Sequence, residues 1–179
     1  MIDKTMTVPR RRRKLCPDLS RRGFFAAAAE LSLAAASVLA SIPATQAATT
    51  EQIVNDRHTG LAISGFDPVA YFIDGTAALG NDAFEHAFGG VAWRFCNEGN
   101  LAAFIVDPEL YIPQFGGYDP VAVARGVAVP GDPRLWLMSE ERLYLFFAPE
   151  ARGAFASDAK RLSATADRKW PAVQLTLSP

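Results

Sequence analysis

The sequence has 179 residues, half of them hydrophobic, which suits one domain with a sizeable core. Charge is unevenly distributed along the chain. Residues 1–47 contain eight lysines and arginines against three acidic residues, so that ten basic and sixteen acidic residues remain in 48–179. An acidic body of this kind argues against nucleic acid and against anionic membrane surfaces as binding partners.

Residues 1–47 have the features of an export signal. The basic run Arg10–Lys14 is followed by SRRGFF, in which Arg21 and Arg22 resemble the pair of a twin-arginine signal. An apolar, alanine-rich stretch, Phe24–Ala40, comes next and is too short and too weakly hydrophobic for a stable membrane span. The small residues of TQA, at 45–47, favour cleavage directly after this segment. We therefore expect a cleaved signal peptide, recognition by the twin-arginine export machinery, and a periplasmic or secreted protein without a stable membrane anchor.

The use of cysteine follows from this cleavage. The chain has two cysteines, and Cys16 leaves with the signal peptide. The mature chain then contains one cysteine, Cys96, which excludes an internal disulfide in that form of the protein. Cys96 is a buried thiol, a metal ligand, a reactive thiol or half of an intermolecular bridge.

The elements expected after the signal begin with a leader and a short helix. Residues 48–60 are polar and aperiodic, and we interpret them as a leader before a domain at 61–171 and a tail at 172–179. In GFDPVAYF, residues 65–72, Asp67 is expected to cap a helix that starts at Pro68, because a proline needs no N–H in the first turn.

A first β-hairpin and a second helix are expected next. The segment AFEHAFGGVAWRFC, residues 83–96, predicts a hairpin around Gly89–Gly90 with Glu85 opposite Arg94. Asn97 is expected to cap a helix over 98–106. The apolar stripe of that helix consists of Leu101, Phe104 and Ile105.

The remaining segments predict more short elements. DPELY at 107–111 is another Asp-Pro helix start, and RLWLMS and RLYLFFA predict a second hairpin around Glu140–Glu141. A last helix is expected from Pro149 to a stop at Pro171, followed by a short strand in VQLTL. Short helices interleaved with two β-hairpins indicate a small single α+β domain.

One pattern occurs twice. GFDPVA at 65–70 and GYDPVA at 117–122 share a glycine, an aromatic residue and Asp-Pro-Val-Ala at a spacing of 52 residues. Six residues are too few to indicate a duplicated domain. We interpret Asp119–Pro120 as the same helix start used a second time.

Taken together, GFDPVAYF, the Gly-x-x-Trp-x-Phe pattern at 90–95, DPELYIPQFGGY and LYLFF resemble the secreted YHS-domain proteins. The resemblance runs from about Ile63 to Trp170. It implies a small metal-handling module, in which a Phe-Cys-Ser-x-x-Cys segment before a helix and a Gly-Gly-Tyr-Cys loop carry candidate ligands. Here Phe95 and Cys96 match that segment, whereas Asn100 and Asp119 stand at the two other cysteine positions.

Three residues are candidate ligands for a transition-metal ion: Cys96, Asp119 and His86. Cys96 offers a thiolate, and an aspartate in place of a cysteine shifts the preference towards harder ions. Each residue also has a structural interpretation. Cys96 is then a small buried hydrophobe, Asp119 a helix cap and His86 a half-buried imidazole among aromatic side chains. His58 lies in the polar leader and is expected to be exposed.

Tyr111, Phe115 and Tyr118 surround the Gly116–Gly117 turn and either form a surface for a partner or an apolar ligand or cover the core. Two hypotheses for the function remain. In the first, an exported YHS-like module binds a metal ion for trafficking or sensing; in the second, a metal-free domain binds a periplasmic partner or an apolar ligand. No nucleophile-elbow or phosphate-loop motif supports an enzyme, and a small periplasmic enzyme is therefore the third and least favoured hypothesis.

Overall fold

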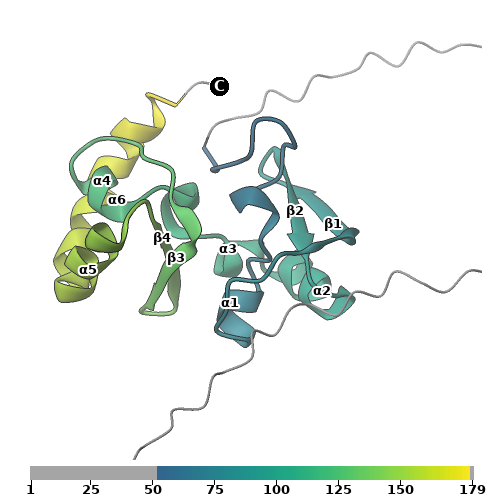
Figure 1. The fold of residues 1–179 in the computed structure, drawn as a ribbon. Coiled ribbons are helices and arrows are strands. Elements are labelled where there is room, and N and C mark those ends of the chain that lie inside the picture. The colour runs from purple at the N-terminus through teal and green to yellow at the C-terminus, as the bar shows by residue number, and fades with distance from the viewer. Residues whose placement is uncertain (1–51, 178–179) are drawn as a thin grey trace, which may run out of the picture.

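The computed structural model describes residues 52–177, which form the mixed α+β domain expected from the sequence (Figure 1). Within these residues two antiparallel hairpins are embedded among short helices. The elements are η1 (Ile63–Gly65), α1 (Ala70–Ile73), β1 (Asn81–Phe88), β2 (Val91–Phe95), α2 (Glu98–Val106), α3 (Pro108–Tyr111), η2 (Gln114–Gly117), α4 (Pro120–Ala124), β3 (Asp132–Ser139), β4 (Arg142–Phe146), α5 (Pro149–Ser157) and α6 (Ala159–Gln174).

The first hairpin has the predicted register. Glu85 pairs with Arg94 and His86 with Trp93, and the Arg94 guanidinium donates to the Glu85 carboxylate over 2.8 Å. The turn at Gly89–Gly90 has positive φ at both residues, as a tight two-residue hairpin requires. The pairing shifts once, between Asn81 and Glu85.

The second hairpin also turns where it was predicted to turn. Leu137 pairs with Tyr144 and Ser139 with Arg142, and the pairing shifts between Asp132 and Trp136. Its two turn residues are Glu140 and Glu141, with φ of 50° and 58°. The two hairpins therefore share one turn geometry although only the first uses glycine.

The C-terminal helix differs from the prediction. The chain breaks at Asp158 into α5 and α6, and α6 continues through Pro171 to Gln174, so that residues 173–177 form no strand. A proline inside a helix removes one backbone hydrogen bond. The buried side chain of Val173 holds the last turn against the core and offsets that loss.

The end of the predicted leader belongs to the packed structure. The Val54 N–H donates to the Gly116 carbonyl over 2.8 Å, and the Val54 carbonyl accepts from the Ile63 N–H over 2.8 Å. A Cβ at Gly116 would lie 1.9 Å from the Gln52 carbonyl oxygen, so this crossing requires a glycine there. Residues 52–54 thus join η2 to η1, whereas the leader was expected to end at residue 60.

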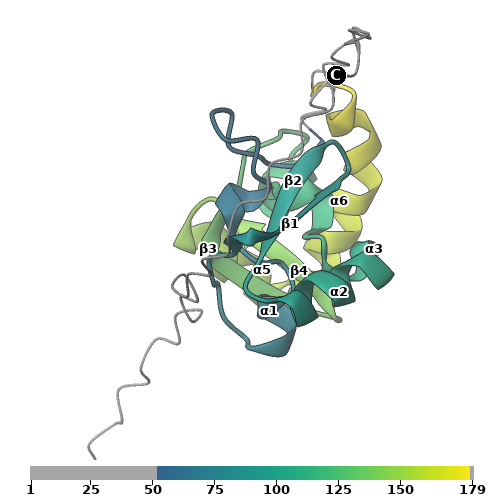
Figure 2. The same cartoon turned by 90° about the vertical axis from the view of Figure 1, so that its right-hand side faces the viewer.

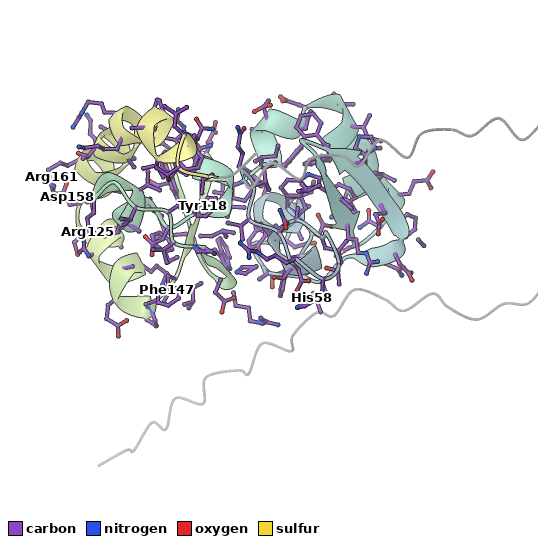
Figure 3. All side chains as sticks on the ribbon, turned by 90° about the horizontal axis from the view of Figure 1, so that it is seen from above. His58, Tyr118, Arg125, Phe147, Asp158 and Arg161 are labelled. Carbon is purple, nitrogen blue, oxygen red and sulfur yellow. The ribbon has the colours of Figure 1, made fainter. Side chains whose placement is uncertain are left out.

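The domain is built as two similar halves, which corrects the view that the shared motif is only a repeated helix start. The first half, residues 61–111, runs η1–α1–β1–β2–α2–α3, and the second, residues 112–177, runs η2–α4–β3–β4–α5–α6. Viewed from above, the two halves lie side by side (Figure 3).

Backbone hydrogen bonds repeat between the halves. The Gly80 N–H donates to the Gly65 carbonyl over 2.9 Å, and the Gly131 N–H donates to the Gly117 carbonyl over 3.0 Å. Isolated bridges pair Phe66 with Leu79 and Tyr118 with Pro130. The duplication therefore extends well beyond the six residues that the two motifs share.

The aromatic packing repeats as well. Phe104 of α2 packs against Trp93 and Phe95, with ring centroids 5.3 and 5.0 Å apart. Phe155 of α5 packs in the same way against Tyr144 and Phe146, at 4.7 and 5.4 Å. Each half therefore has its own aromatic centre.

Strand β4 connects the two cores. Leu143 and Leu145 pack into the core of the first half, whereas Tyr144 and Phe146 pack into the core of the second. Because successive side chains of a strand point to opposite faces, a strand buried on both sides serves two cores.

Side chains on other elements also join the halves. The Tyr71 hydroxyl of α1 donates to the Pro133 carbonyl over 2.8 Å, and the Tyr71 ring meets the Trp136 ring edge-on at 5.3 Å. The Arg134 guanidinium lies 4.9 Å from the centroid of the Phe66 ring.

Of the helices in residues 52–177, none combines the length and the apolar character that a membrane-spanning helix needs.

Candidate functional site

Asp67 lies at the centre of the most elaborate polar cluster in the first half. Its Oδ1 accepts hydrogen bonds from the Val69 and Ala70 N–H groups, at 2.8 and 3.3 Å. Its Oδ2 accepts from the Cys96 N–H at 2.7 Å and from Asn100 Nδ2 at 2.6 Å. One fully buried carboxylate thereby holds the turn that leads into α1 and fixes the junction between β2 and α2. The helix itself begins at Ala70, after a turn at residues 68–69, and not at Pro68 as predicted.

Burial and hydrogen bonding act on Asp67 in opposite directions. Removal from water raises the pKa of its carboxyl, and the four hydrogen bonds lower it, with burial the larger influence. The four donors are neutral groups, so no cation compensates the carboxylate at this point. The hydrogen bonds therefore have a structural purpose, which is to hold three segments of the first half together.

Asp119 occupies the corresponding place in the second half. Its Oδ1 accepts from the Val121 and Ala122 N–H groups, at 2.8 and 3.3 Å, and its Oδ2 accepts from the Phe147 N–H at 3.0 Å. The prediction that Asp119 caps a helix is confirmed. The position equivalent to Asn100 is Ala151, so the second cluster lacks a side-chain donor there.

Cys96 follows the last residue of β2 and is buried, with its Sγ 3.5 Å from the Leu79 carbonyl oxygen. The other cysteine of the sequence, Cys16, lies outside the described residues. The exclusion of an internal disulfide concerns the chain after removal of residues 1–47 and stays a prediction. The second half has Phe147, which is exposed, at the equivalent position (Figure 3).

His86 does not join this cluster. It is half-buried on β1, pairs with Trp93, and its ring lies 6.4 Å from that of Phe104. Strand alternation places it with the Trp93 side chain, on the face opposite Arg94. His58 is exposed, as expected.

The three predicted ligands therefore lie in three different settings: Cys96 beside Asp67, Asp119 in the other half, and His86 against Phe104. Within residues 52–177 no three side chains of histidine, cysteine, aspartate or glutamate gather as a metal ion would require. The oxygens of Asp67 and Asp119 already accept backbone N–H groups. These residues do not fit the ligand set that the YHS resemblance implies.

The aromatic residues around the Gly116–Gly117 turn cover the core. Phe115 and Tyr118 are buried, and their rings pack 5.6 and 5.9 Å from that of Trp170 on α6. Tyr111 is half-buried, and its ring meets that of Phe72 edge-on at 5.2 Å. Of the two interpretations of these residues, the structure favours core packing over an exposed binding surface.

Four of the eight large apolar residues that are exposed within residues 52–177 lie on α1, α2 and α3, and this was not predicted. Ile73 of α1, Ile105 and Val106 of α2, and Leu110 of α3 are 63, 53, 85 and 45% exposed. We call these four residues the α1–α3 face. The sequence placed Ile105 in the buried stripe of its helix, but α2 turns only Phe104 fully into the core. The apolar character of the four residues was visible in the sequence, and their exposure was not.

Neither a protein-family model, nor a curated protein, nor a solved structure matches this chain. The resemblance to secreted YHS-domain proteins therefore stays a prediction from the quoted motifs. Arg21, Arg22 and the rest of the expected export signal lie outside the described residues.

Proposed function

We propose that this chain is an exported, non-enzymatic binding module that recognises a protein partner without a bound metal ion. The observation that carries the proposal is the use of Asp67 and Asp119. Asp119 is itself a predicted metal ligand, and Asp67 is the hydrogen-bond partner of Cys96, another predicted ligand. Both oxygens of each carboxylate accept hydrogen bonds from backbone N–H groups. Ligation of a metal ion would remove bonds that hold α1 or α4 to its hairpin.

Metal content and thermal stability test the metal-free part of this proposal. Protein purified gently after export is expected to contain no stoichiometric transition metal by elemental mass spectrometry. Its melting temperature should be unchanged by a chelator, because a ligand that binds the folded state stabilises it by mass action. A stoichiometric metal ion that is lost in Cys96→Ala, together with a fall in melting temperature on chelation, would restore the metal hypothesis.

The export part rests on the twin-arginine pair. Cleavage after Ala47 would leave intact the crossing of residues 52–54 between η2 and η1, so the mature chain would keep every contact described above. We expect the mature protein to begin at Ala48 and to be found in the periplasm or outside the cell. Replacing Arg21 and Arg22 by lysine should leave the full-length chain in the cytoplasm. Normal export of that variant would refute the signal assignment.

A further inference from the structure

The α1–α3 face is formed by three helices that lie at one end of the first half (Figure 2). Helices α2 and α3 are consecutive, separated by Asp107, and the edge-on contact between Phe72 and Tyr111 joins α1 to α3. The helices that carry the four exposed apolar residues are therefore linked along the chain or through this ring contact.

The second half serves as an internal control for this face. Ile73 corresponds to Arg125, Ile105 to Ala156, Val106 to Ser157, and Leu110 to Arg161. These four residues are exposed as well, and they are small or charged. Since the same backbone positions accept polar residues in one half, the fold does not require large apolar side chains there. Their presence in the first half is better explained by an interaction.

Charge gives the face a second property. Asp74, Asp107 and Glu109 directly adjoin its apolar residues in the chain and are exposed. In residues 61–111 there are seven acidic residues and one basic residue, Arg94, which is paired with Glu85. The face therefore has an apolar centre and an acidic rim.

We propose that the α1–α3 face binds a basic amphipathic helix of a partner protein, an inference that rests on the proposed function as a binding module. The apolar stripe of such a helix would cover Ile73, Val106 and Leu110, and its lysines and arginines would lie opposite the acidic rim. An anionic lipid surface is disfavoured by the same acidic residues.

A second copy of this chain is a poorer occupant. Its one basic amphipathic helix among the described elements is α6, with Lys160, Arg161, Arg168 and Lys169. The apolar side of α6 is already used, because Ala166 and Val173 are buried in the core of the second half. Docking α6 of another copy would first require it to leave that core.

Binding of labelled model peptides to the full chain tests this inference. One peptide is a helix with a leucine stripe and lysines on its other face, and the second has the same leucines with glutamates. We expect the lysine peptide to bind by fluorescence anisotropy, more weakly as salt is raised, and the glutamate peptide to bind at least about tenfold more weakly.

The decisive variant replaces residues of the face by their counterparts in the second half: Ile73→Arg, Val106→Ser and Leu110→Arg together. It should weaken binding of the lysine peptide at least about tenfold. The control is Leu175→Ser, which removes another exposed apolar side chain and should leave binding unchanged. Circular dichroism and melting temperature confirm that both variants fold.

The inference would be overturned by equal binding of both peptides, by unchanged binding to the triple variant, or by a wild-type dimer in sedimentation that the triple substitution dissociates. In the last case the occupant would be a second copy. If the protein is metal-free and binds neither peptide, this class of partner is refuted, while the proposed metal-free function stands. Protein with a stoichiometric, stabilising metal ion would refute the proposed function itself.

Discussion

Each half contains a buried aspartate that accepts hydrogen bonds from backbone N–H groups, but the two aspartates have different numbers of donors. Asp67 accepts four hydrogen bonds and Asp119 accepts three, because Asn100 of α2 has Ala151 of α5 as its counterpart. In both, the carboxylate accepts backbone N–H groups at the start of a helical segment and holds the residue after the last strand of a hairpin. The buried aspartate and its backbone donors are common to both halves. The side-chain donor and the exposed faces of the helices differ between them.

Removing the aspartates should have the largest effect on stability. Asp67→Ala leaves four buried donors unsatisfied and should lower the free energy of unfolding by about 3–4 kcal/mol, whereas Asp119→Ala, with three donors, should lower it by about 2–3 kcal/mol. Urea unfolding followed by circular dichroism measures both.

Asp107→Ala is the matched control. Asp107 also precedes a proline at a helix start, but its side chain makes no capping bond, so a change within about 0.5 kcal/mol is expected. An equal fall in the free energy of unfolding in all three variants would contradict a special role for the two buried aspartates.

The repeated glycines should come next. A Cβ at Gly80 would lie 2.4 Å from the backbone carbon of Arg94, and one at Gly131 would lie 2.8 Å from the Gly117 carbonyl oxygen. Alanine at either position should therefore cost about 2–3 kcal/mol, because the backbones of hairpin and turn must separate. Gly153→Ala in α5, where a Cβ meets nothing within 4 Å, should instead stabilise by about 0.5–1 kcal/mol. Thermal unfolding of the three variants distinguishes these signs, and tolerance of alanine at both Gly80 and Gly131 would contradict the close approach.

Exchanging the side-chain donor sharpens the difference between the halves. Asn100→Ala should cost about 1–2 kcal/mol, because Asp67 Oδ2 keeps only the Cys96 N–H as a donor. Ala151→Asn places a donor at the equivalent position in α5 and should stabilise Asp119 by up to about 1 kcal/mol. Urea unfolding of the two variants and their combination gives the result. If Ala151→Asn is destabilising while Asn100→Ala has no effect, the two clusters are not equivalent.

The smallest effect is expected at the hairpin turns. Glu140 and Glu141 have the left-handed backbone that Gly89 and Gly90 adopt in the first hairpin. Replacing Glu140–Glu141 by Asn-Gly should raise the free energy of unfolding by about 1 kcal/mol, since non-glycine residues are strained at positive φ. Gly90→Ala should lower it by a similar amount, about 1 kcal/mol. A shift of the two melting temperatures in the same direction would contradict a shared turn geometry.

The sequence by itself determined the local elements. The register of the first hairpin, the turn of the second, the Asn97 cap of α2 and the helix start after Asp119 follow from contacts between residues close in the chain, which local chemistry specifies. It also contained the six-residue repeat, but the rest of the duplication consists of backbone hydrogen bonds that place few demands on side chains. Such bonds leave almost no trace in a single sequence.

Only the tertiary structure decided what each candidate residue touches. Asp67 meets Cys96 and Asn100 across about thirty positions of chain, and Phe115 and Tyr118 are buried because α6 brings Trp170 over them. The exposure of Ile105 and Val106 depends on which side of α2 packs against the core of the first half. Burial is set by the packing of distant segments, so Ile105, which the sequence assigned to a core stripe with Leu101 and Phe104, lies on the surface of the fold.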